Sequence, residues 1–308
     1  MNSIISVARA MVSLSAFHVL VVLSWPQAAV ADEPPLFEAR VLERIDAFDA
    51  HQAVAANAHN FYAVNNFRIT RHERDTGKPQ RQWDGISKDS GPLIHLNSGM
   101  VLDGRLYAAH SNYPGWPMTS SIEVWDADTM EHIDSISLGI SVGSMTWVDR
   151  HDGSWWAGFA NYDKIQSGQD HPYGETRFTQ IVQMDDDFTV RRRWTLPDGL
   201  LARMAPMSNS GGSWGPGGYL YLTGHDYPEI YVVQLPRSGS QLHWVATVRV
   251  PDLNGQGIAW DRSADERILW AILRRQEQVY QIQMPDIQLD RQDAARVRGP
   301  DKFTRDRD

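Results

Sequence analysis

Three side chains within five residues could carry acid–base chemistry or hold a metal ion: His225, Asp226 and Glu229. An imidazole beside carboxylates can exchange protons near neutral pH, and the same nitrogen and oxygen atoms are ligands for Zn²⁺, Mn²⁺ or Fe²⁺. Oxygen ligands without histidine would suit Ca²⁺ instead. The spacing does not decide between metal-assisted and metal-free chemistry. In either case the three residues are predicted to be catalytic.

Further polar side chains occur at equivalent places along the chain. The segments Leu106–Pro114 and Leu220–Pro228 are alike, and alignment on their Tyr-Pro pairs puts Asn112 opposite Asp226. Four histidines are predicted as ligands of a divalent metal, namely His51, His95, His110 and His225. The predicted substrate-binding residues are Gln52, Asn65, Asn97, Asn112, Tyr113, Asn161, Asn209, Gln256 and Arg274.

A repeat of strands must position these side chains. Five times a pair of aromatic or large apolar residues closes a strand-like run after a turn, at residues 61–62, 106–107, 155–156, 220–221 and 269–270. The second residues of these pairs stand 45, 49, 65 and 49 positions apart. Such periods indicate one four-stranded propeller blade per repeat, and no window of helical period competes.

The fifth repeat ends one strand short. The missing strand is expected at the other end of the chain, where Ala39 to Ile45 alternate like a strand and belong to no repeat. A strand from the N-terminus that completes the last blade would leave no open sheet edge. The sequence therefore predicts an all-β fold, a five-bladed β-propeller whose last blade is closed by the N-terminal strand.

The propeller topology predicts where the polar residues meet. Loops that lead into the innermost strands and loops between the second and third strands open on the same face, around the central channel. Most of the candidate residues fall in these loops, so they are expected to line one polar funnel. A simpler explanation is that loops favour Asn, Asp and Ser, but it does not account for histidines at equivalent places in three blades.

Three segments of the chain are distinguished by composition. Residues 1–31 carry one charge, Arg9, and an apolar stretch followed by Ala29-Val30-Ala31, which predicts a signal peptide and a periplasmic or secreted protein. A membrane anchor is the alternative, but the stretch is shorter than the ~20 residues that span a bilayer. Residues 32–285 are predicted to form the single propeller domain, and the charged tail 286–308 is predicted to be disordered.

Charge and cysteine content exclude several classes of function. The formal net charge is −9, and removal of Arg9 with the signal peptide would make it −10. An acidic chain without a basic block does not suit nucleic acid or anionic membrane. The absence of cysteine excludes disulfides, thiol catalysis and Cys-ligated metals. The expected partner is a small molecule, bound by a monomer that has no contact with the membrane after signal cleavage.

The blade pattern resembles a known group of secreted propellers. It is carried by His51 to Ala55, Phe61 to Val64 and Asp75 to Lys78. The pattern is similar to that of plant-type glutamine cyclotransferases and of quinoprotein-like or lactonase-like propellers. In the cyclotransferases a Glu follows the aromatic strand of an early blade, and no carboxylate stands at that place here. The calcium ligands of the lactonase type are matched in part, by Asn97, Asn112, Asn161, Asp226 and Glu229.

Two functions from different classes follow. The first is an exported enzyme of hydrolase, lactonase or cyclase type that acts on a small polar substrate with the help of Zn, Mn, Fe or Ca. The second is a non-catalytic periplasmic propeller that binds a ligand or a protein, and a cofactor-dependent oxidoreductase ranks third. Bound metal would favour the enzyme. An exposed apolar patch beside the funnel, without a perturbed carboxylate, would favour the binding protein.

Overall fold

The computed structural model describes residues 33–85, 93–165, 170, 174–264 and 267–298. Residues 34–308 make up one compact unit and residues 1–33 another, and the fold below is that of the former. The predicted signal peptide lies outside the described residues. No helix in the described ranges has both the length and the apolar composition that a bilayer span requires.

The described chain is mostly β-structure, arranged in antiparallel meanders. The first sheet has the order β3-β4-β5-β6 and consists of β3 (Ala53–Ala56), β4 (Asn60–Val64), β5 (Arg68–Glu73) and β6 (Pro79–Asp84). The next two meanders are β7 (Leu96–Leu102), β8 (Arg105–Ser111), β9 (Thr119–Asp126) and β10 (His132–Ile140), and then β11 (Ser144–His151), β12 (Ser154–Ala160), β13 (Gln180–Met184) and β14 (Val190–Thr195). A single parallel pair, Ser98 with Trp147, joins β7 to β11 and makes a curled sheet of eight strands.

Two strands that precede the first meander in sequence join the two remaining sheets. One adds a fifth strand to the fourth meander, and the other supplies the fourth strand of the last sheet. The fourth meander has β15 (Gly211–Trp214), β16 (Leu220–Thr223), β17 (Glu229–Gln234) and β18 (His243–Arg249), and β1 (Leu36–Glu38) adds to β18 in parallel. The last sheet has β19 (Ala259–Trp260), β20 (Ile268–Leu273) and β21 (Gln278–Gln283), and its fourth strand is β2 (Arg40–Asp46). β2 pairs antiparallel with β21, which is the pairing expected from the sequence.

Local sequence explains the tight turns between strands. Asp103 and Gly104 connect β7 to β8 with φ of 48° and 71°, and Asp152 and Gly153 connect β11 to β12 with φ of 46° and 70°. Two consecutive positive φ values define the hairpin turn that Asp-Gly favours. These turns lie at the end of the sheets opposite the polar loops.

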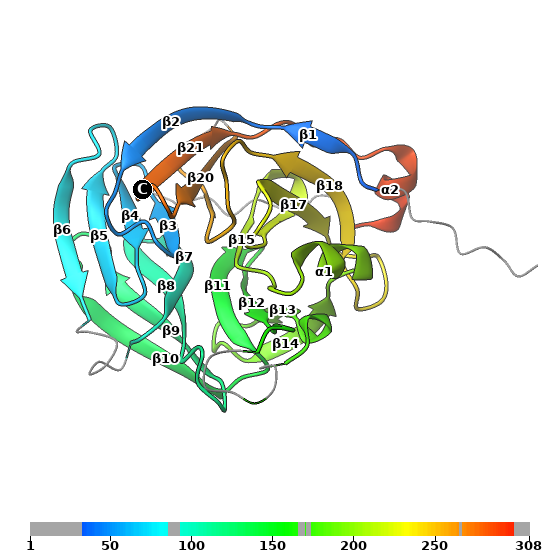
Figure 1. The fold of residues 1–308 in the computed structure, drawn as a ribbon, viewed down its shortest axis with the longest axis horizontal. Coiled ribbons are helices and arrows are strands. Elements are labelled where there is room, and N and C mark those ends of the chain that lie inside the picture. Colours follow the sequence, from blue (N-terminus) through cyan, green and yellow to red (C-terminus); the bar gives the residue numbers. More distant parts are fainter. Residues whose placement is uncertain (1–32, 86–92, 166–169, 171–173, 265–266, 299–308) are drawn as a thin grey trace, which may run out of the picture. The chain divides into compact units, whose positions relative to one another are not determined.

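The sheets follow one another around a common centre. β3 contacts β7, β7 contacts β11, β11 contacts β15, β15 contacts β19, and β19 contacts β3. Figure 1 shows β3, β7, β11 and β15 near the middle and β6, β10 and β2 at the periphery. The arrangement is propeller-like, and the first strand of each meander lies innermost.

Aromatic side chains fill the space between the sheets. Trp125, Trp147, Trp214 and Trp270 are fully buried. The Trp147 indole packs directly against two glycines on neighbouring strands. A Cβ at Gly158 would lie 2.2 Å from an indole atom, and a Cβ at Gly212 would lie 2.4 Å from one, so a side chain at either position would clash with the ring. Trp147 Nε1 donates to Asn209 Oδ1 at 2.7 Å, which satisfies its polar atom. Packing of this kind supplies stability that disulfides would otherwise provide.

A buried ion pair links the third meander to the last sheet. Arg262, which follows β19, contacts the carboxylate of Asp149 on β11, and both side chains are almost inaccessible to solvent. Asp149 also accepts from the Trp214 backbone N at 2.6 Å and from Ser213 Oγ at 3.2 Å. The carboxylate is thus paired and hydrogen-bonded, as a buried charge must be.

The short helices, like β1, were not predicted from the sequence. They are α1 (Asp198–Met204), α2 (Arg291–Arg296) and the 3₁₀ turns η1 (Thr176–Phe178) and η2 (Pro216–Gly218). α2 lies in the tail predicted to be disordered: Asp290 caps it by accepting from Asp293 N at 2.8 Å. Val297 then pairs with Pro236 beyond β17 and is buried. The rest of the tail, 299–308, lies outside the described residues.

Candidate functional site

A cavity of about 360 Å³ receives side chains from every sheet. We call it the central cavity. It is lined by Gln52, Asn66, Ile94, His95, Asn97, Tyr113, Pro114, Thr146, Tyr162, Met207, Ser210, His225, Gln256 and Arg274.

Two kinds of loop position these residues. Gln52 and His95 come just before the first strands β3 and β7, and Gln256 comes shortly before β19. His225 and Arg274 follow the second strands β16 and β20. Because successive meanders are arranged around one centre, these loops meet at the same end of the sheets although their residues are far apart in sequence.

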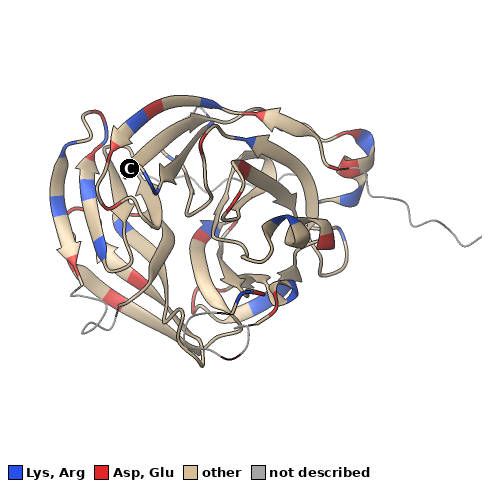
Figure 2. Cartoon of the chain, in the orientation of Figure 1, with Lys and Arg blue, Asp and Glu red and all other residues tan. Residues whose placement is uncertain are grey.

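The electrostatics of the cavity are dominated by one cation. Among the lining residues that the structure describes, Arg274 is the only Lys or Arg, and none is Asp or Glu. Burial lowers the pKa of His95 to about 4, with smaller contributions from His110, Arg274 and His225. Burial also lowers the pKa of His225. Both rings are therefore neutral at pH 7, and the guanidinium supplies the positive charge. Figure 2 shows both signs of charge spread over the outer strands and loops instead.

The tautomer of His225 follows from its hydrogen bond. Its Nδ1 lies 2.9 Å from the carbonyl oxygen of Ser208, so Nδ1 carries the proton and donates it. Nε2 is then the atom with a lone pair. This arrangement presents the cavity with a neutral imidazole whose free nitrogen can accept a hydrogen bond or a proton.

Another part of the lining is aromatic and apolar. The Tyr113 ring lies 5.0 Å from that of His95 and 5.4 Å from that of Tyr162, measured between centroids. Tyr113 and Met207 pack against a small buried cluster that includes Met118 and Tyr162. These residues come from the second, third and fourth meanders, whereas Gln52, Asn66, Gln256 and Arg274 come from the first and last.

The structure brings together about half of the residues predicted from the sequence. Seven of them line the central cavity: Gln52, His95, Asn97, Tyr113, His225, Gln256 and Arg274. The predicted convergence of distant loops therefore holds for these side chains. Six more lining residues were missed, namely Asn66, Ile94, Pro114, Thr146, Tyr162 and Ser210, and Met207 is a seventh. Most of them are direct neighbours of predicted residues, and that adjacency was the available signal.

Two of the predicted metal ligands do not line the cavity. His110 lies behind its wall, where Nε2 accepts from the Ile94 backbone N at 3.2 Å and Nδ1 contacts Ser121 Oγ at 2.9 Å. His51 is turned outward, and its Nε2 lies 3.2 Å from Glu277 Oε1. In the part of the chain that the structure describes, no three His, Asp or Glu side chains are grouped so that they could hold a metal ion.

The two predicted catalytic carboxylates also lie outside the lining. Asp226 is exposed in the loop after β16. Glu229 begins β17 and is buried, where its carboxylate accepts from Arg203 Nε at 2.9 Å and from Nη2 at 2.5 Å. The Arg203 guanidinium in turn lies over the Tyr227 ring, 4.4 Å from the centroid. This ion pair links α1 to β17.

Four of the predicted asparagines hold loops in place. Asn112 donates to the Pro117 carbonyl at 3.0 Å and accepts from Thr119 N at 2.8 Å. Asn161 Nδ2 donates to the carbonyls of Val142 and Phe178 at 2.9 and 3.1 Å. Asn65 Oδ1 accepts from the next backbone N, and Asn209 bridges Gly211, Thr223 and Trp147. Short amide side chains commonly replace backbone partners in this way.

Large apolar side chains are exposed in loops, in the η1 turn and at the end of β10. We call them the apolar rim: Trp116, Ile140, Val142, Ile165, Phe178 and Tyr227. Ile140 is 75% and Trp116 61% exposed. Trp116 stands two residues from the lining residue Pro114, and the backbone carbonyls of Val142 and Phe178 both accept from the Asn161 amide. Large exposed apolar groups at one place favour a binding surface.

Comparisons with known proteins do not identify a family for this chain. No protein-family profile and no curated protein matches the sequence. Among solved structures, the PQQ-bound aldose sugar dehydrogenase (Adh) from Streptomyces coelicolor is similar at 16% identity, with a TM-score of 0.42 over 83% of this chain and 84% of that one. KlAtg21 in complex with the coiled coil of AgAtg16 is similar at 13% identity, with a TM-score of 0.38 over 74% of this chain and 62% of that one.

Proposed function

We propose that the chain is a five-bladed β-propeller, closed by β2, that binds a small organic anion in the central cavity. The observation that carries this proposal is the charge of the lining, in which the described residues include Arg274 and no carboxylate. A guanidinium recognises carboxylate or phosphate oxygens through paired hydrogen bonds. The neutral His225, with its free Nε2, and the amides of Gln52 and Gln256 would satisfy the remaining polar atoms of the ligand.

The ligand is expected to carry an aromatic or apolar portion beside its anionic group. The two tyrosines and Met207 line the cavity, and Trp116 of the apolar rim stands two residues from the lining residue Pro114. A ligand with both features would bury apolar area against Tyr113 and Tyr162 while its charge meets Arg274. An aryl carboxylate is the simplest molecule of this class.

Binding without turnover is the function that the geometry supports best. The predicted carboxylates Asp226 and Glu229 do not line the cavity, and the described residues include no group of metal ligands. The apolar rim is the feature that was expected to distinguish a binding protein from a hydrolase. With the predicted signal peptide, the proposal is an exported protein that captures a small ligand outside the cytoplasm.

A hydrolytic or isomerising enzyme is the second candidate, and one observation favours it. The Ser208 carbonyl fixes the His225 tautomer with a 2.9 Å hydrogen bond, which is how a general base is often oriented. Arg274 could then stabilise a developing oxyanion. Turnover that is lost in His225→Gln but retained in His59→Gln, which changes an exposed histidine, would support this candidate.

The binding proposal is tested with three probes of the same size and different charge: benzoate, benzyl alcohol and benzylamine. Titration calorimetry on the purified protein should detect benzoate binding and weaker or no binding of the other two. Arg274→Gln should weaken benzoate binding by about tenfold or more, the amount expected for a hydrogen bond to a charged group.

The neighbouring Arg275 provides the matched control, because it is exposed in the same turn and does not line the cavity. Arg274 is exposed as well, and the two residues differ in that only Arg274 lines the cavity. Arg275→Gln should therefore leave the affinity for benzoate within about twofold. Equal losses in the two variants, or equal binding of benzoate and benzyl alcohol, would contradict recognition of an anion by Arg274.

A further inference from the structure

The loops that follow the second strands place four side chains of the central cavity in a fixed order. Tyr113 follows β8, Tyr162 follows β12, His225 follows β16 and Arg274 follows β20. Because the first strands contact one another in chain order around the centre, these loops are arranged in the same order around the cavity. His225 therefore stands between the two tyrosines and Arg274.

Ring distances and electrostatics agree with this order. The ring centroids of Tyr113 and Tyr162 lie 5.4 Å apart, and those of Tyr162 and His225 lie 6.2 Å apart with the rings edge to face at 75°. Burial is the largest cause of the lowered pKa of His225, and the charge of Arg274 lowers it further. An aromatic surface, an imidazole and a guanidinium thus follow one another along the wall.

His225 presents the cavity with a hydrogen-bond acceptor and no donor. Its Nδ1 donates to the Ser208 carbonyl at 2.9 Å, so Nε2 carries the lone pair. Nε2 makes no hydrogen bond to the residues that the structure describes, and it is not enclosed by protein, so a ligand in the cavity can reach it. A carboxylate has no proton to share with this nitrogen. A ligand that fills this place must bring an O–H or N–H group.

The surrounding charge favours a hydroxyl over an ammonium group. After burial, the positive charges of Arg274 and Lys164 contribute to the lowered pKa of His225. The carboxylate of Asp226 opposes them, but it does not line the cavity. An ammonium beside His225 would be repelled by the same two cations, whereas a neutral O–H donates to Nε2 without that repulsion.

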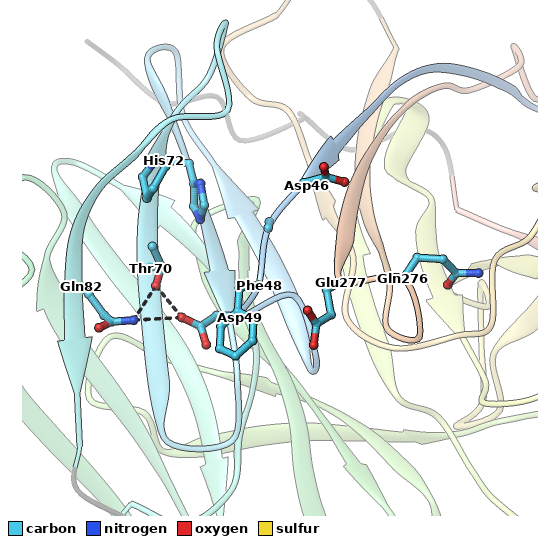
Figure 3. Close-up of a pocket in the computed structure, with 10 residues that line it drawn as sticks. Asp46, Phe48, Asp49, Thr70, His72, Gln82, Gln276 and Glu277 are labelled. Atoms are coloured by element: carbon cyan, nitrogen blue, oxygen red, sulfur yellow. Dashed lines mark hydrogen bonds between the residues drawn. The ribbon is translucent and has the colours of Figure 1, made fainter.

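A larger cavity, of about 650 Å³, shows the contrast (Figure 3). It lies between the first sheet and the end of β2, and the buried carboxylate of Asp49 lines it. Arg68 Nε, Thr70 Oγ1 and Gln82 Nε2 donate to this carboxylate at 2.7, 2.5 and 3.2 Å. Asp49 is thus satisfied within the protein, whereas Arg274 forms no ion pair with a residue that the structure describes.

We propose that the central cavity takes an aryl acid with a hydroxyl group on the carbon beside the carboxylate. The order of groups in such an α-hydroxy arylacetate matches the order along the wall. The carboxylate meets Arg274, the hydroxyl donates to His225 Nε2, and the aryl ring packs on Tyr162 and Tyr113. This ligand class narrows the organic anion proposed above, on which it rests, by specifying a hydroxyl group and its place. Three different contacts around one carbon also distinguish its two enantiomers.

The experiment compares the enantiomers of mandelate with three molecules of the same skeleton. Phenylacetate lacks the hydroxyl, α-methoxyphenylacetate keeps the oxygen without its proton, and phenylglycine carries an ammonium group instead. Titration calorimetry on the full chain should show that one enantiomer of mandelate binds about fivefold more tightly than each of these three, the value of one hydrogen bond between uncharged groups. The other enantiomer should bind no better than phenylacetate.

Two variants test the acceptor. His225→Phe keeps a ring and removes Nε2, so mandelate and phenylacetate should bind it equally well. His59→Phe makes the same change at an exposed histidine and should keep the preference for mandelate. If mandelate binds the unaltered protein no better than phenylacetate, or if the preference survives in His225→Phe, the hydroxyl site is wrong and the anion site stands. If neither acid binds the unaltered protein, both are wrong.

Discussion

At the scale of single residues, neutral histidines are the most testable property of the central cavity. Burial lowers the pKa of His95 to about 4 and also lowers the pKa values of His110 and His225. In the unfolded chain each ring titrates near pH 6.5. The unfolded state therefore binds more protons than the folded state between these values, and acid favours unfolding.

We therefore expect the free energy of unfolding to be fully retained above pH 6.5 and to fall as the pH is lowered towards 4. Each proton taken up only by the unfolded state contributes a slope of about 1.4 kcal/mol per pH unit. His95→Gln should lower this slope by up to about 1.4 kcal/mol per pH unit, the contribution of one proton. Urea unfolding at several pH values measures the slope. His59→Gln, in an exposed turn, is the control, and a slope that His95→Gln leaves unchanged would argue against a neutral, buried His95.

The ion pair between Asp149 and Arg262 allows a prediction about stability. Arg262→Met would leave the buried carboxylate without its counter-ion, and such losses typically cost about 3–5 kcal/mol. Arg193→Met, on the exposed outer strand β14, should cost less than about 0.5 kcal/mol. Both values come from urea unfolding of the purified variants. Equal stability of the two variants would mean that Asp149 is not charged in the folded protein.

At the scale of elements, the sequence predicted strands better than helices. The alternation in residues 99–138 corresponds to β7–β10, and the Asp-Gly turn at residue 103 has the expected conformation. α1 is only seven residues long, too short for its three buried apolar residues to repeat at a helical period. β1 was missed because three residues show no alternation, and its parallel pairing with β18 depends on tertiary contacts alone.

The two N-terminal strands should differ in importance. Removal of residues 34–38 deletes β1, which lies outside β18, and we expect a folded protein with a modest loss of stability. Removal of residues 34–46 also deletes β2 and exposes the edge of β21, so the protein should aggregate. Size-exclusion chromatography and thermal unfolding compare the two. A soluble longer deletion with an unchanged melting temperature would show that β2 is not needed to complete the last sheet.

At the scale of the whole molecule, the topology predicted that distant loops meet at one end of the sheets, but not which of their side chains line the cavity. The position of a loop in the repeat determines at which end of the sheets it lies, so Gln52, His95 and Arg274 could be brought together from sequence. Whether a side chain then faces the cavity depends on local partners. Asn161 turns to two carbonyls, and Glu229 turns to Arg203 on a helix that the pattern did not reveal. Such partners lie 17 to 26 residues away.

The circular sequence of contacts between first strands predicts cooperative unfolding. Because β19 contacts β3 and β2 completes the last sheet, no meander has a free side from which unfolding could begin. Urea transitions followed by tryptophan fluorescence and by far-UV circular dichroism should therefore coincide. The 12 tryptophans report on several meanders at once. Two separated transitions would indicate that part of the fold is independently stable.

The pairing of β2 with β21 also bears on the order of events during biosynthesis. Asp46 is synthesised first, and its partner Gln278 follows 232 residues later. At an elongation rate of about 5–20 residues per second, that interval is on the order of ten to fifty seconds. Throughout this time β2 has no partner, and the meanders already made remain an open arc. The last sheet can be completed only after β21 has been synthesised, so the ring of contacts is expected to close late relative to the folding of the first meanders.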